Sequence, residues 1–376
     1  MENLVIKLPR DFEEFYKGKR VVVTGHTGFK GAWLTLWLVK LGADVVGYSL
    51  NPPTNPNLFD TLKLNEKITH IIGDIRDLES LKGIFKRYKP NIVFHLAAQS
   101  IVRNSYIEPK LTYETNVMGT VNVLEALRTT LNEGSIIIVT SDKCYENKEW
   151  VHMYRENDPL GGYDPYSSSK GCAELVTAAY RNSYFNPDEF GNNHRVALAT
   201  VRAGNVIGGG DWAQDRIIPD CIRSLTNNRK ISIRNPNAIR PWQFVLDPLS
   251  GYLMLGTILE RNGKTFSGSW NFGPKGGEVI TVKDLVSCVI EIWGKGEYVL
   301  DANKQPYEAK FLALDTNKAL LYLGWRPIYR IHDAIKKTIE WYKEYYSNCK
   351  DIYEYSLNQI VEYNNKASKN DVVRVC

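Results

Sequence analysis

The sequence predicts an α/β protein in which a doubly wound parallel sheet is followed by a smaller, mixed α/β lobe toward the C-terminus. Short β-branched runs alternate with helix-length segments through the first two thirds of the chain, and a glycine-rich turn follows the first run. From about Gly208 the alternation stops, and turns rich in Gly and Pro separate shorter elements. The first pattern is typical of parallel strands joined by crossover helices, and its end predicts a second lobe.

Six apolar runs are expected to form strands of one sheet. They are continuous rather than alternating, which is typical of strands that helices cover on both faces. The runs span residues 20–24, 44–48, 70–72, 92–96, 135–140 and 196–201.

The second part of the chain is punctuated by glycine and proline at 208–210, 234–236 and 272–274. An amphipathic pattern over 331–346 predicts one last long helix. We therefore expect a first domain over 1–205 and a lobe over 206–360, some of whose strands and helices return to the first domain. Residues 361–376 are expected to form a flexible polar tail.

Composition excludes several classes of protein. The 376 residues are 43% hydrophobic and carry a net charge of +5, so there is material for a core but no strongly basic surface that favours nucleic acid. No apolar stretch approaches the ~18 residues of a membrane span, and the start does not resemble a leader peptide. The six cysteines and six histidines lack metal-ligand spacing, so we expect a cytoplasmic protein with reduced thiols and no metal.

Three glycines stand at three-residue spacing where the first strand turns into an apolar helix: Gly25, Gly28 and Gly31. Backbone without side chains can approach a pyrophosphate closely, and the helix N-terminus attracts its charge. An ordinary tight turn is the alternative. The position on the first strand of an α/β alternation favours a Rossmann-like dinucleotide site.

The loop after the second strand bears on which dinucleotide is bound. NAD sites usually place an acidic residue there and NADP sites a basic one, and residues 47–53 supply neither. Ser49 and Asn51 can still hydrogen-bond a ribose hydroxyl. We therefore favour NAD, and Lys30, which can reach a phosphate from the start of the helix, is the main argument against it.

Tyr166 and Lys170 are four residues apart in a helix that Asp164 and Pro165 are expected to open, so they share one face. A nearby ammonium, together with a positive nicotinamide ring, would lower the tyrosine pKa from about 10 toward neutrality. Tyr166 is then a candidate general base. The alternative is an exposed i,i+4 pair, which is common on helices.

Several motifs occur in an order that resembles the extended branch of the short-chain dehydrogenase/reductase superfamily. They are the glycine turn, residues 73–77, residues 96–99, Asn116, Ser141 and the Tyr166/Lys170 pair, and residues 323–327 and 340–342 resemble that branch's C-terminal lobe. The resemblance implies an NAD-binding first domain. The cofactor contacts it implies are Gly25, Thr27, Gly28, Phe29, Lys30, Gly31, Ser49, Asp74, Ile75, Leu96, Ala97, Ala98, Gln99, Asn116, Tyr166 and Lys170.

Residues 140–145, 201–212 and 239–243 are similar to a narrower family, the CDP-glucose 4,6-dehydratases. That family oxidises the sugar at carbon 4, eliminates water across carbons 5 and 6, and returns the hydride to carbon 6. The resemblance implies that Tyr166 takes the 4-hydroxyl proton while NAD takes the hydride. Ser141 would hydrogen-bond the same oxygen, and Lys170 would hold the ribose and tune Tyr166.

Elimination needs a base for the carbon-5 proton and an acid for the departing hydroxyl. Sugar-nucleotide 4,6-dehydratases generally place Asp and then Glu here, whereas this chain has Asp142 followed by Lys143. We expect Asp142 to be the acid. Lys143 is the candidate base if burial or cationic neighbours lower its pKa, and the alternative is that it only anchors the substrate or Asp142.

The lobe is expected to bind the sugar nucleotide. Arg216 and Arg240 are candidate diphosphate ligands because guanidinium forks match phosphate oxygens. Asn205 matches a family position that hydrogen-bonds the substrate phosphate, and we also expect Arg103 to contact the substrate. Surface salt bridges and an ordinary turn residue are the alternatives.

Two other functions compete with a CDP-sugar dehydratase. An NAD-linked sugar-nucleotide epimerase or reductase shares every site residue except the pair after Ser141. A non-enzymatic dinucleotide-binding regulator would be expected to lose Tyr166 or Lys170, and both are present. Apolar helix faces at 111–131 and 165–184 predict a homodimer or a dimer of dimers.

Overall fold

A computed structural model describes residues 10–275, 278–301, 311–347 and 351–372. Its centre is a seven-stranded sheet with the order β11-β6-β5-β4-β1-β2-β3, in which every neighbouring pair is parallel. The strands are β1 (Arg20–Thr24), β2 (Asp44–Ser49), β3 (Thr69–Ile72), β4 (Ile92–His95), β5 (Glu133–Val139), β6 (Arg195–Ala203) and β11 (Gly268–Phe272).

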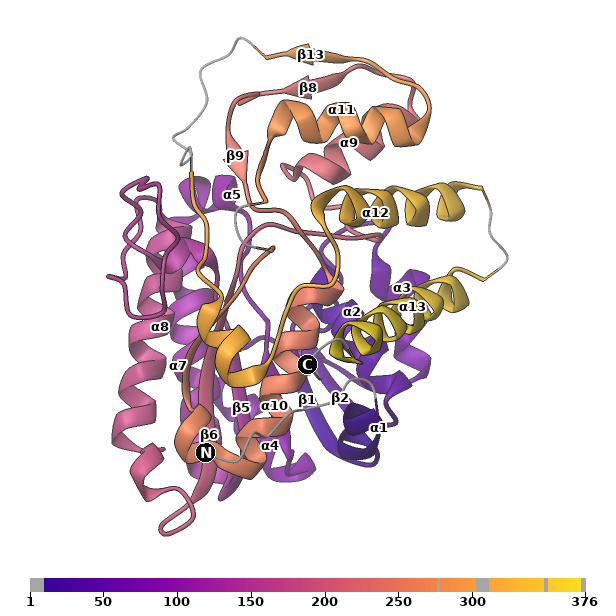
Figure 1. Ribbon diagram of the computed structural model, residues 1–376. Helices are drawn as coiled ribbons and strands as arrows, with labels where there is room; N and C mark the ends of the chain where they lie inside the picture. The colour runs from indigo at the N-terminus through magenta and orange to yellow at the C-terminus, as the bar shows by residue number, and fades with distance from the viewer. Residues whose placement is uncertain (1–9, 276–277, 302–310, 348–350, 373–376) are drawn as a thin grey trace.

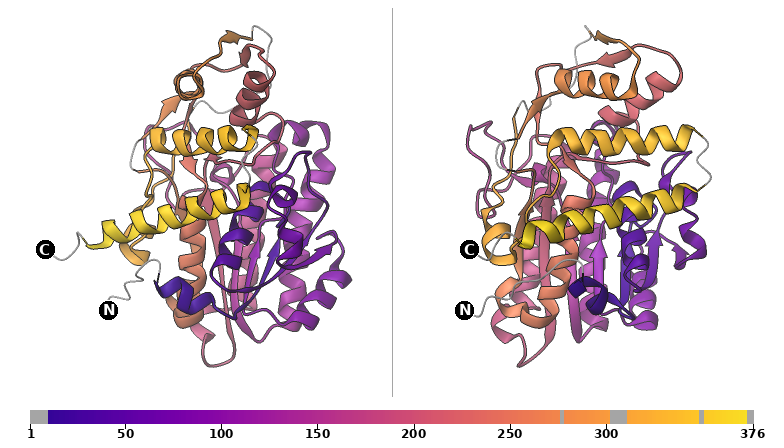
Figure 2. Two further views of the ribbon diagram at one scale, coloured as in Figure 1. Left: turned by 90° about the vertical axis from the view of Figure 1, so that its right-hand side faces the viewer. Right: turned by 45° about the vertical axis from the view of Figure 1, so that its right-hand side comes forward.

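Helices cover both faces of this sheet (Figures 1 and 2). Alternate residues of each strand point to opposite faces, so Val21 and Val23 pack in one apolar cluster and Val22 in the other. The first face is covered by α2 (Phe29–Lys40) and α10 (Leu246–Phe266), and the second by α4 (Leu78–Tyr88), α7 (Gly119–Thr130) and α8 (Pro165–Ser183). This doubly wound arrangement confirms the predicted fold class.

Short elements precede or connect the strands of the main sheet. They are α1 (Arg10–Tyr16), α3 (Leu58–Thr61), η1 (Leu64–Glu66), α5 (Val102–Ile107), α6 (Pro109–Tyr113), the π-helical η2 (Glu114–Met118), η3 (Asp142–Cys144) and η4 (Pro187–Glu189).

A smaller mixed lobe stands beyond the carboxyl ends of the strands, at the top of Figure 1. Three two-stranded pairs and three helices build most of it. They are β7 (Val206–Ile207) with β10 (Gln243–Phe244), β9 (Ile239–Arg240) with β12 (Ile280–Thr281), β8 (Ile231–Ile233) with β13 (Tyr298–Leu300), α9 (Ile217–Thr226), α11 (Val282–Trp293) and α12 (Ile331–Tyr346). The π-helical η5 (Ala319–Leu323) precedes α12 in the chain and packs on α10 and β11.

Later segments return to the first domain. β11 pairs with β6 at one edge of the main sheet, and α10 packs on β5 and β6. No expected strand corresponded to β11, because Gly268 and the Gly273-Pro274 pair that flank it are read from sequence as turn signals.

The prediction of a flexible tail from residue 361 is wrong. α13 (Ile352–Val372) continues through that point, and Ile360 and Tyr363 are fully buried against α2 and α12. Tyr363 packs edge-on against Trp37 and donates to the Asp247 carboxylate at 3.0 Å. The buried side chains are spaced on one face of a mostly polar helix, which composition alone does not reveal.

Candidate active site

The predicted cofactor and catalytic residues gather at the carboxyl edge of the main sheet. Sequence order reverses between β4 and β1, since β1 lies between β4 and β2. Ligands of open α/β sheets bind at such a switch point. The glycine turn follows β1, Leu96 to Gln99 follow β4, and Ser141 lies two residues beyond β5.

The glycine turn depends on the absence of side chains. Gly25 has a φ of +76°, and a Cβ there would lie 2.6 Å from the backbone nitrogen of Ala97. A Cβ on Gly31 would lie 2.1 Å from the carbonyl oxygen of Gly25. Gly28 stands at the N-cap of α2, so no side chain caps the first turn of the helix. That N-terminus therefore offers its backbone donors to an anion.

The ribose end of the site contains hydroxyls rather than charges. Thr27 Oγ1 donates to the carbonyl of Leu50 at 2.9 Å and lies 2.8 Å from Ser49 Oγ. Lys30 does not point toward this end of β2. Its Nζ donates to the hydroxyl of Tyr252 on α10 at 3.0 Å. Lys30 therefore no longer supports NADP as the cofactor.

Lys30 instead interacts electrostatically with charged residues of the catalytic site. Burial, together with the positive charges of Lys170 and Arg216 and against the raising effect of Asp142, lowers its pKa to about 7. A cation with so low a pKa is poised to gain or lose its proton near neutral pH.

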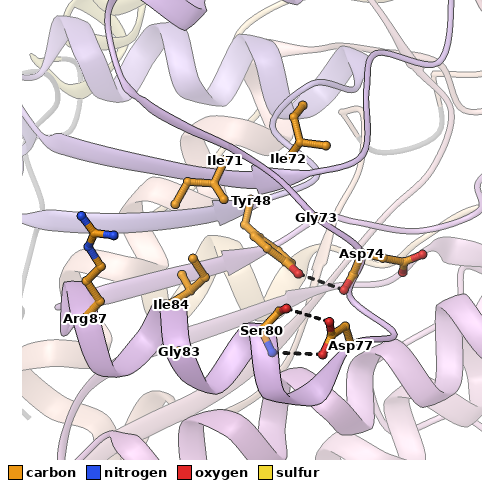
Figure 3. Close-up of a pocket in the computed structure, with 10 residues that line it drawn as sticks. All are labelled: Tyr48, Ile71, Ile72, Gly73, Asp74, Asp77, Ser80, Gly83, Ile84 and Arg87. Carbon is orange, nitrogen blue, oxygen red and sulfur yellow. Dashed lines mark hydrogen bonds between the residues drawn. The ribbon is translucent and has the colours of Figure 1, made fainter.

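The turn that carries Asp74 and Ile75 is held by Tyr48 beside a surface groove between β3 and α4 (Figure 3). The Tyr48 hydroxyl donates to the carbonyl of Asp74 at 3.0 Å. The Asp74 carboxylate accepts from Arg76, and this bond lowers the pKa of Asp74, which stays ionised.

Asn116 connects the loop after β4 to the helix that carries the catalytic pair. Its Oδ1 accepts from the backbone N–H of Gln99 at 2.8 Å, and its Nδ2 donates to the carbonyl of Gln99 and to Ser169 Oγ. Asn116 lies in the π-helical η2, a distortion that is frequent at functional sites. The predicted residue therefore orients α8.

Tyr166 and Lys170 are both buried on α8, which Asp164 caps by accepting from the backbone N–H of Ser167. The alternative of an exposed helical pair is wrong. The groups of the chain alone do not lower the Tyr166 pKa, so the predicted lowering would depend on the nicotinamide ring as well as on Lys170. Burial raises this pKa to about 12, opposed by a hydrogen bond with Ser141, while Lys170 Nζ donates to the carbonyl of Val139 at 3.4 Å.

Lys170 itself is tuned by burial, which lowers its pKa to about 8. The nearby Cys144 and Glu174 act in the opposite direction. Lys170 therefore carries its positive charge below about pH 8, as a partner of a developing phenolate requires.

Ser141 and Asp142 form a hydrogen-bonded unit at the start of η3. Ser141 Oγ donates to Asp142 Oδ1 at 2.9 Å and accepts from the backbone N–H of Lys143. Burial raises the pKa of Asp142, against the opposing effects of Lys143, Ser141 and Arg240. A carboxyl group that holds its proton more tightly than usual is suited to act as an acid.

Two of the predicted substrate residues lie near the catalytic groups, since the charge of Arg216 acts on Tyr166 and that of Arg240 on Asp142. Arg216 donates to Asp211 and to Ser100 Oγ, each at 2.9 Å, and Arg103 lies 3.4 Å from Asp215. Arg240 is close enough to Asp142 to affect its pKa. Asn205 accepts the backbone N–H of Gln243 through its carbonyl.

Sequence reasoning missed Tyr252, Glu174 and Arg202. Tyr252 lies on α10, where an apolar pattern concealed it. Glu174 and Arg202 form an ion pair of 2.7 Å with both side chains 2% exposed. A usable signal was present, because an arginine inside the apolar run of β6 requires a buried partner.

Comparisons with known proteins show the family of the chain. Residues 22–338 match the family model described as GDP-mannose 4,6 dehydratase. The chain belongs to this dehydratase family. It is also 53% identical over 332 residues to a CDP-glucose 4,6-dehydratase of Salmonella typhimurium, covering 88% of this chain and 92% of that one. A human dTDP-D-glucose 4,6-dehydratase is 28% identical over 351 residues, covering 89% and 93%.

Solved structures share the fold of this family member. A Bacillus anthracis dTDP-glucose 4,6-dehydratase in complex with NAD gives a TM-score of 0.71 at 22% identity, covering 89% of this chain and all of that one. A UDP-glucose 4-epimerase of Thermotoga maritima gives 0.74 at 22%, covering 87% and 99%. The sequence-based assignment to the sugar-nucleotide dehydratases is confirmed.

No helix among the described residues combines the length and apolar character needed to cross a bilayer. Within the same part of the chain, His, Cys, Asp and Glu side chains do not gather in threes around a metal position.

Proposed function

We propose that this dehydratase acts on CDP-glucose, using NAD, and forms CDP-4-keto-6-deoxyglucose. The observation that carries the proposal is the hydrogen-bonded turn Ser141-Asp142-Lys143 beside Tyr166 and Lys170. An epimerase needs the second pair but not an acid of raised pKa next to Ser141. The cytidine assignment is supported by the 53% identity to the Salmonella enzyme.

The residues of the first domain fit NAD. The uncapped first turn of α2 suits the pyrophosphate, and Ser49 and Thr27 offer hydroxyls without a cation to attract a 2′-phosphate. When bound, NAD accepts the hydride from carbon 4 and later returns it to carbon 6. Burial raises the Tyr166 pKa, so the positive nicotinamide ring would add to the charge of Lys170 in stabilising the Tyr166 phenolate.

In the oxidation step Tyr166 accepts the proton of the sugar 4-hydroxyl. Ser141 hydrogen-bonds the same oxygen, and Lys170 in its ammonium form stabilises the negative charge on Tyr166. The side chains of Ser141, Tyr166 and Lys170 are all buried, so water competes little for these hydrogen bonds.

In the elimination step Asp142 gives its proton to the departing 6-hydroxyl. Its burial favours the protonated form from which it must act. Lys143 is the proposed base for the carbon-5 proton, since it directly follows Asp142 and is half-buried. Asn205, Arg103, Arg216 and Arg240 are proposed to bind the phosphates of the sugar nucleotide.

Substrate comparison tests the proposal. The purified chain is incubated separately with CDP-glucose, dTDP-glucose, UDP-glucose and GDP-mannose, and the 4-keto product is followed by its absorbance after alkali treatment. We expect CDP-glucose to be converted with a kcat/KM at least about 100-fold higher than the others, a difference that lost nucleobase hydrogen bonds can produce. Equal conversion of dTDP-glucose, or a 4-epimer as the product, would contradict the proposal.

A homodimer is proposed through the helices beside the active site. Exposed apolar side chains lie on α5, η2 and α8, namely Ile107, Met118, Leu175 and Tyr184, the last at the C-terminal end of α8. Sedimentation equilibrium of the wild type and of Leu175→Glu tests the interface. A wild-type monomer at micromolar concentration would contradict it.

A further inference from the structure

A buried ion pair lies directly beneath the catalytic turn. Glu174 on α8 and Arg202 on β6 meet at 2.7 Å, and Glu174 is bonded through both carboxylate oxygens to the guanidinium. Thr200 Oγ1 also donates to Glu174 at 2.7 Å. The hydrogen bonds from Arg202 hold the pKa of Glu174 low in spite of its burial, so the pair is ionic.

The two flanks of the catalytic turn are bonded to the two members of this pair. Thr140 directly precedes Ser141, and its Oγ1 donates to Glu174 at 2.5 Å. Tyr145 directly follows Cys144, and its hydroxyl accepts from Arg202 at 2.6 Å and donates to Asn271 Oδ1 at 2.8 Å. The turn Ser141–Cys144 is thus anchored at both ends to one ion pair.

The same pair is connected to the oxidation residues by the helix itself. Glu174 stands four residues after Lys170 and eight after Tyr166, so all three lie on one face of α8. A displacement of Glu174 relative to Arg202 would therefore shift the Tyr166/Lys170 pair with respect to Asp142 and Lys143.

We propose that Glu174 and Arg202 are positioning residues that hold the acid–base turn in register with Tyr166 and Lys170. The inference rests on the proposed dehydratase chemistry. Oxidation and elimination occur at neighbouring carbons of one bound sugar, so two sets of groups must be aligned at the same time. A misplacement of about 1 Å can reduce a rate by roughly 100-fold, which makes such an anchor consequential.

Single-flank variants test the proposal without removing the ion pair. Thr140→Val and Tyr145→Phe are nearly isosteric and each remove one anchor. Thr177→Val and Tyr16→Phe are matched controls, since these buried hydroxyls donate to the carbonyls of Ala173 and Leu253 instead. We expect kcat to fall about 10-fold in the two flank variants and to stay within about 2-fold in the controls.

The step that slows distinguishes positioning from general destabilisation. After rapid mixing with CDP-glucose, the flank variants should build an NADH-like transient and lose it much more slowly than the wild type, because elimination depends on Asp142 and Lys143 in the displaced turn. Formation of the transient should slow less, since Tyr166 and Lys170 remain in place on α8 and only Ser141 moves with the turn. KM and the melting temperature should remain close to the wild-type values. If the transient forms and decays at wild-type rates in both flank variants, the proposal is overturned.

A charge-free pair provides the second arm. Glu174→Met combined with Arg202→Met replaces a buried ion pair by apolar groups, an exchange that often preserves stability. We expect a folded protein whose kcat is about 100-fold lower. The corresponding control is Lys19→Met with Glu260→Met, a half-buried ion pair elsewhere. A folded double variant with wild-type kcat would contradict the proposal, as would a loss of activity explained entirely by the unfolded fraction.

The pH profile adds a readout that a purely structural role would not move. Glu174 raises the pKa of Lys170, which is also faced by Cys144, Lys30 and His95. Glu174→Gln removes that charge, so the alkaline limb of kcat should move to lower pH, while Thr140→Val leaves the limb in place. If the wild type fails to convert CDP-glucose, the proposed function fails. If it converts CDP-glucose and both flank variants form and lose the transient at wild-type rates, the positioning role fails; an unmoved limb in Glu174→Gln would contradict the charge effect of Glu174 on Lys170.

Discussion

The two sides of the active site are built in different ways. On the sheet side Ser141, Asp142, Tyr166 and Lys170 are each at most 8% exposed, and buried hydrogen bonds fix the elements that carry them. On the lobe side the guanidinium groups of Arg103, Arg216 and Arg234 are between 24% and 34% exposed.

The lobe-side arginines are also already paired. Arg216 binds Asp211, while Arg103 and Arg234 share Asp215. Asp215 is partly exposed like its two arginines, and such pairs contribute little to stability, so a diphosphate can replace this carboxylate at low cost. Asp211 is buried, so only the Asp215 pairs meet this condition. Under the proposed function, the sheet side is preorganised for proton and hydride transfer, whereas arginines of the lobe side would exchange a carboxylate partner for phosphate oxygens when the nucleotide binds.

The largest effect is expected on the sheet side, from Tyr166→Phe. The substitution removes the proton acceptor and keeps the ring in its buried place. A general base contributes roughly 10²- to 10⁴-fold, so kcat should fall by about that factor. Calorimetric titration should show unchanged affinity for NAD and CDP-glucose. A variant with wild-type turnover would remove Tyr166 from the mechanism.

Asp142→Asn should separate the two chemical steps. Asn keeps the size of the side chain but cannot donate the proton that the leaving hydroxyl needs. Oxidation should survive and dehydration should slow by about 10²-fold, so an NADH-like absorbance should persist after rapid mixing. Normal dehydration in this variant would disprove the acid assignment.

Lys143→Met tests the proposed base in the same assay. Loss of solvent-deuterium exchange at carbon 5, with oxidation intact, is expected of a proton-abstracting lysine. Equal loss of oxidation and exchange would instead assign Lys143 to substrate anchoring.

A smaller effect, and a different one, is expected on the lobe side. Arg216→Lys keeps the charge but loses the fork that can bind two phosphate oxygens, so KM for CDP-glucose should rise about 10-fold with kcat nearly unchanged. Arg128→Lys is the matched control, because Arg128 is paired with Glu125 at similar exposure on α7. A fall in kcat without a change in KM would place Arg216 among the catalytic groups. It would contradict the assignment of catalysis to the sheet side and of substrate binding to the lobe side.

The smallest effect is expected from salt. Raising the ionic strength from about 0.05 to 0.5 M should increase KM for the sugar nucleotide severalfold, because half-exposed charges are screened. The kcat at saturating substrate should change little, since the sheet-side groups are buried. Steady-state kinetics at several salt concentrations measure both quantities, and a salt-dependent kcat with constant KM would contradict the comparison.

Much of the sheet side could be predicted from sequence because strand order and motif spacing define it locally. The run 20–24 is β1 with the predicted bounds, and the helix 331–346 is α12 with the predicted bounds. The glycine turn, Ser141 and the Tyr166/Lys170 pair lie where strand ends and a helix face place them.

What could not be predicted depends on contacts between distant segments. Glu174 and Arg202 are 28 positions apart, and Lys30 reaches Tyr252 over 222 positions. The spacing of Tyr166 and Lys170 shows that they are near each other, but it does not show the burial that raises the Tyr166 pKa. The buried face of α13 was missed because its partners lie on α2 and α10.

The central claim is that one turnover oxidises carbon 4 and reduces carbon 6 of the same sugar. CDP-glucose carrying deuterium at carbon 4 tests it most directly, with the product analysed by NMR and mass spectrometry and NADH followed by absorbance. We expect the deuterium at carbon 6 of the 4-keto product, within the same molecule, and no net NADH. Deuterium recovered in NADH that accumulates in proportion to product, or returned to carbon 4, would contradict the account.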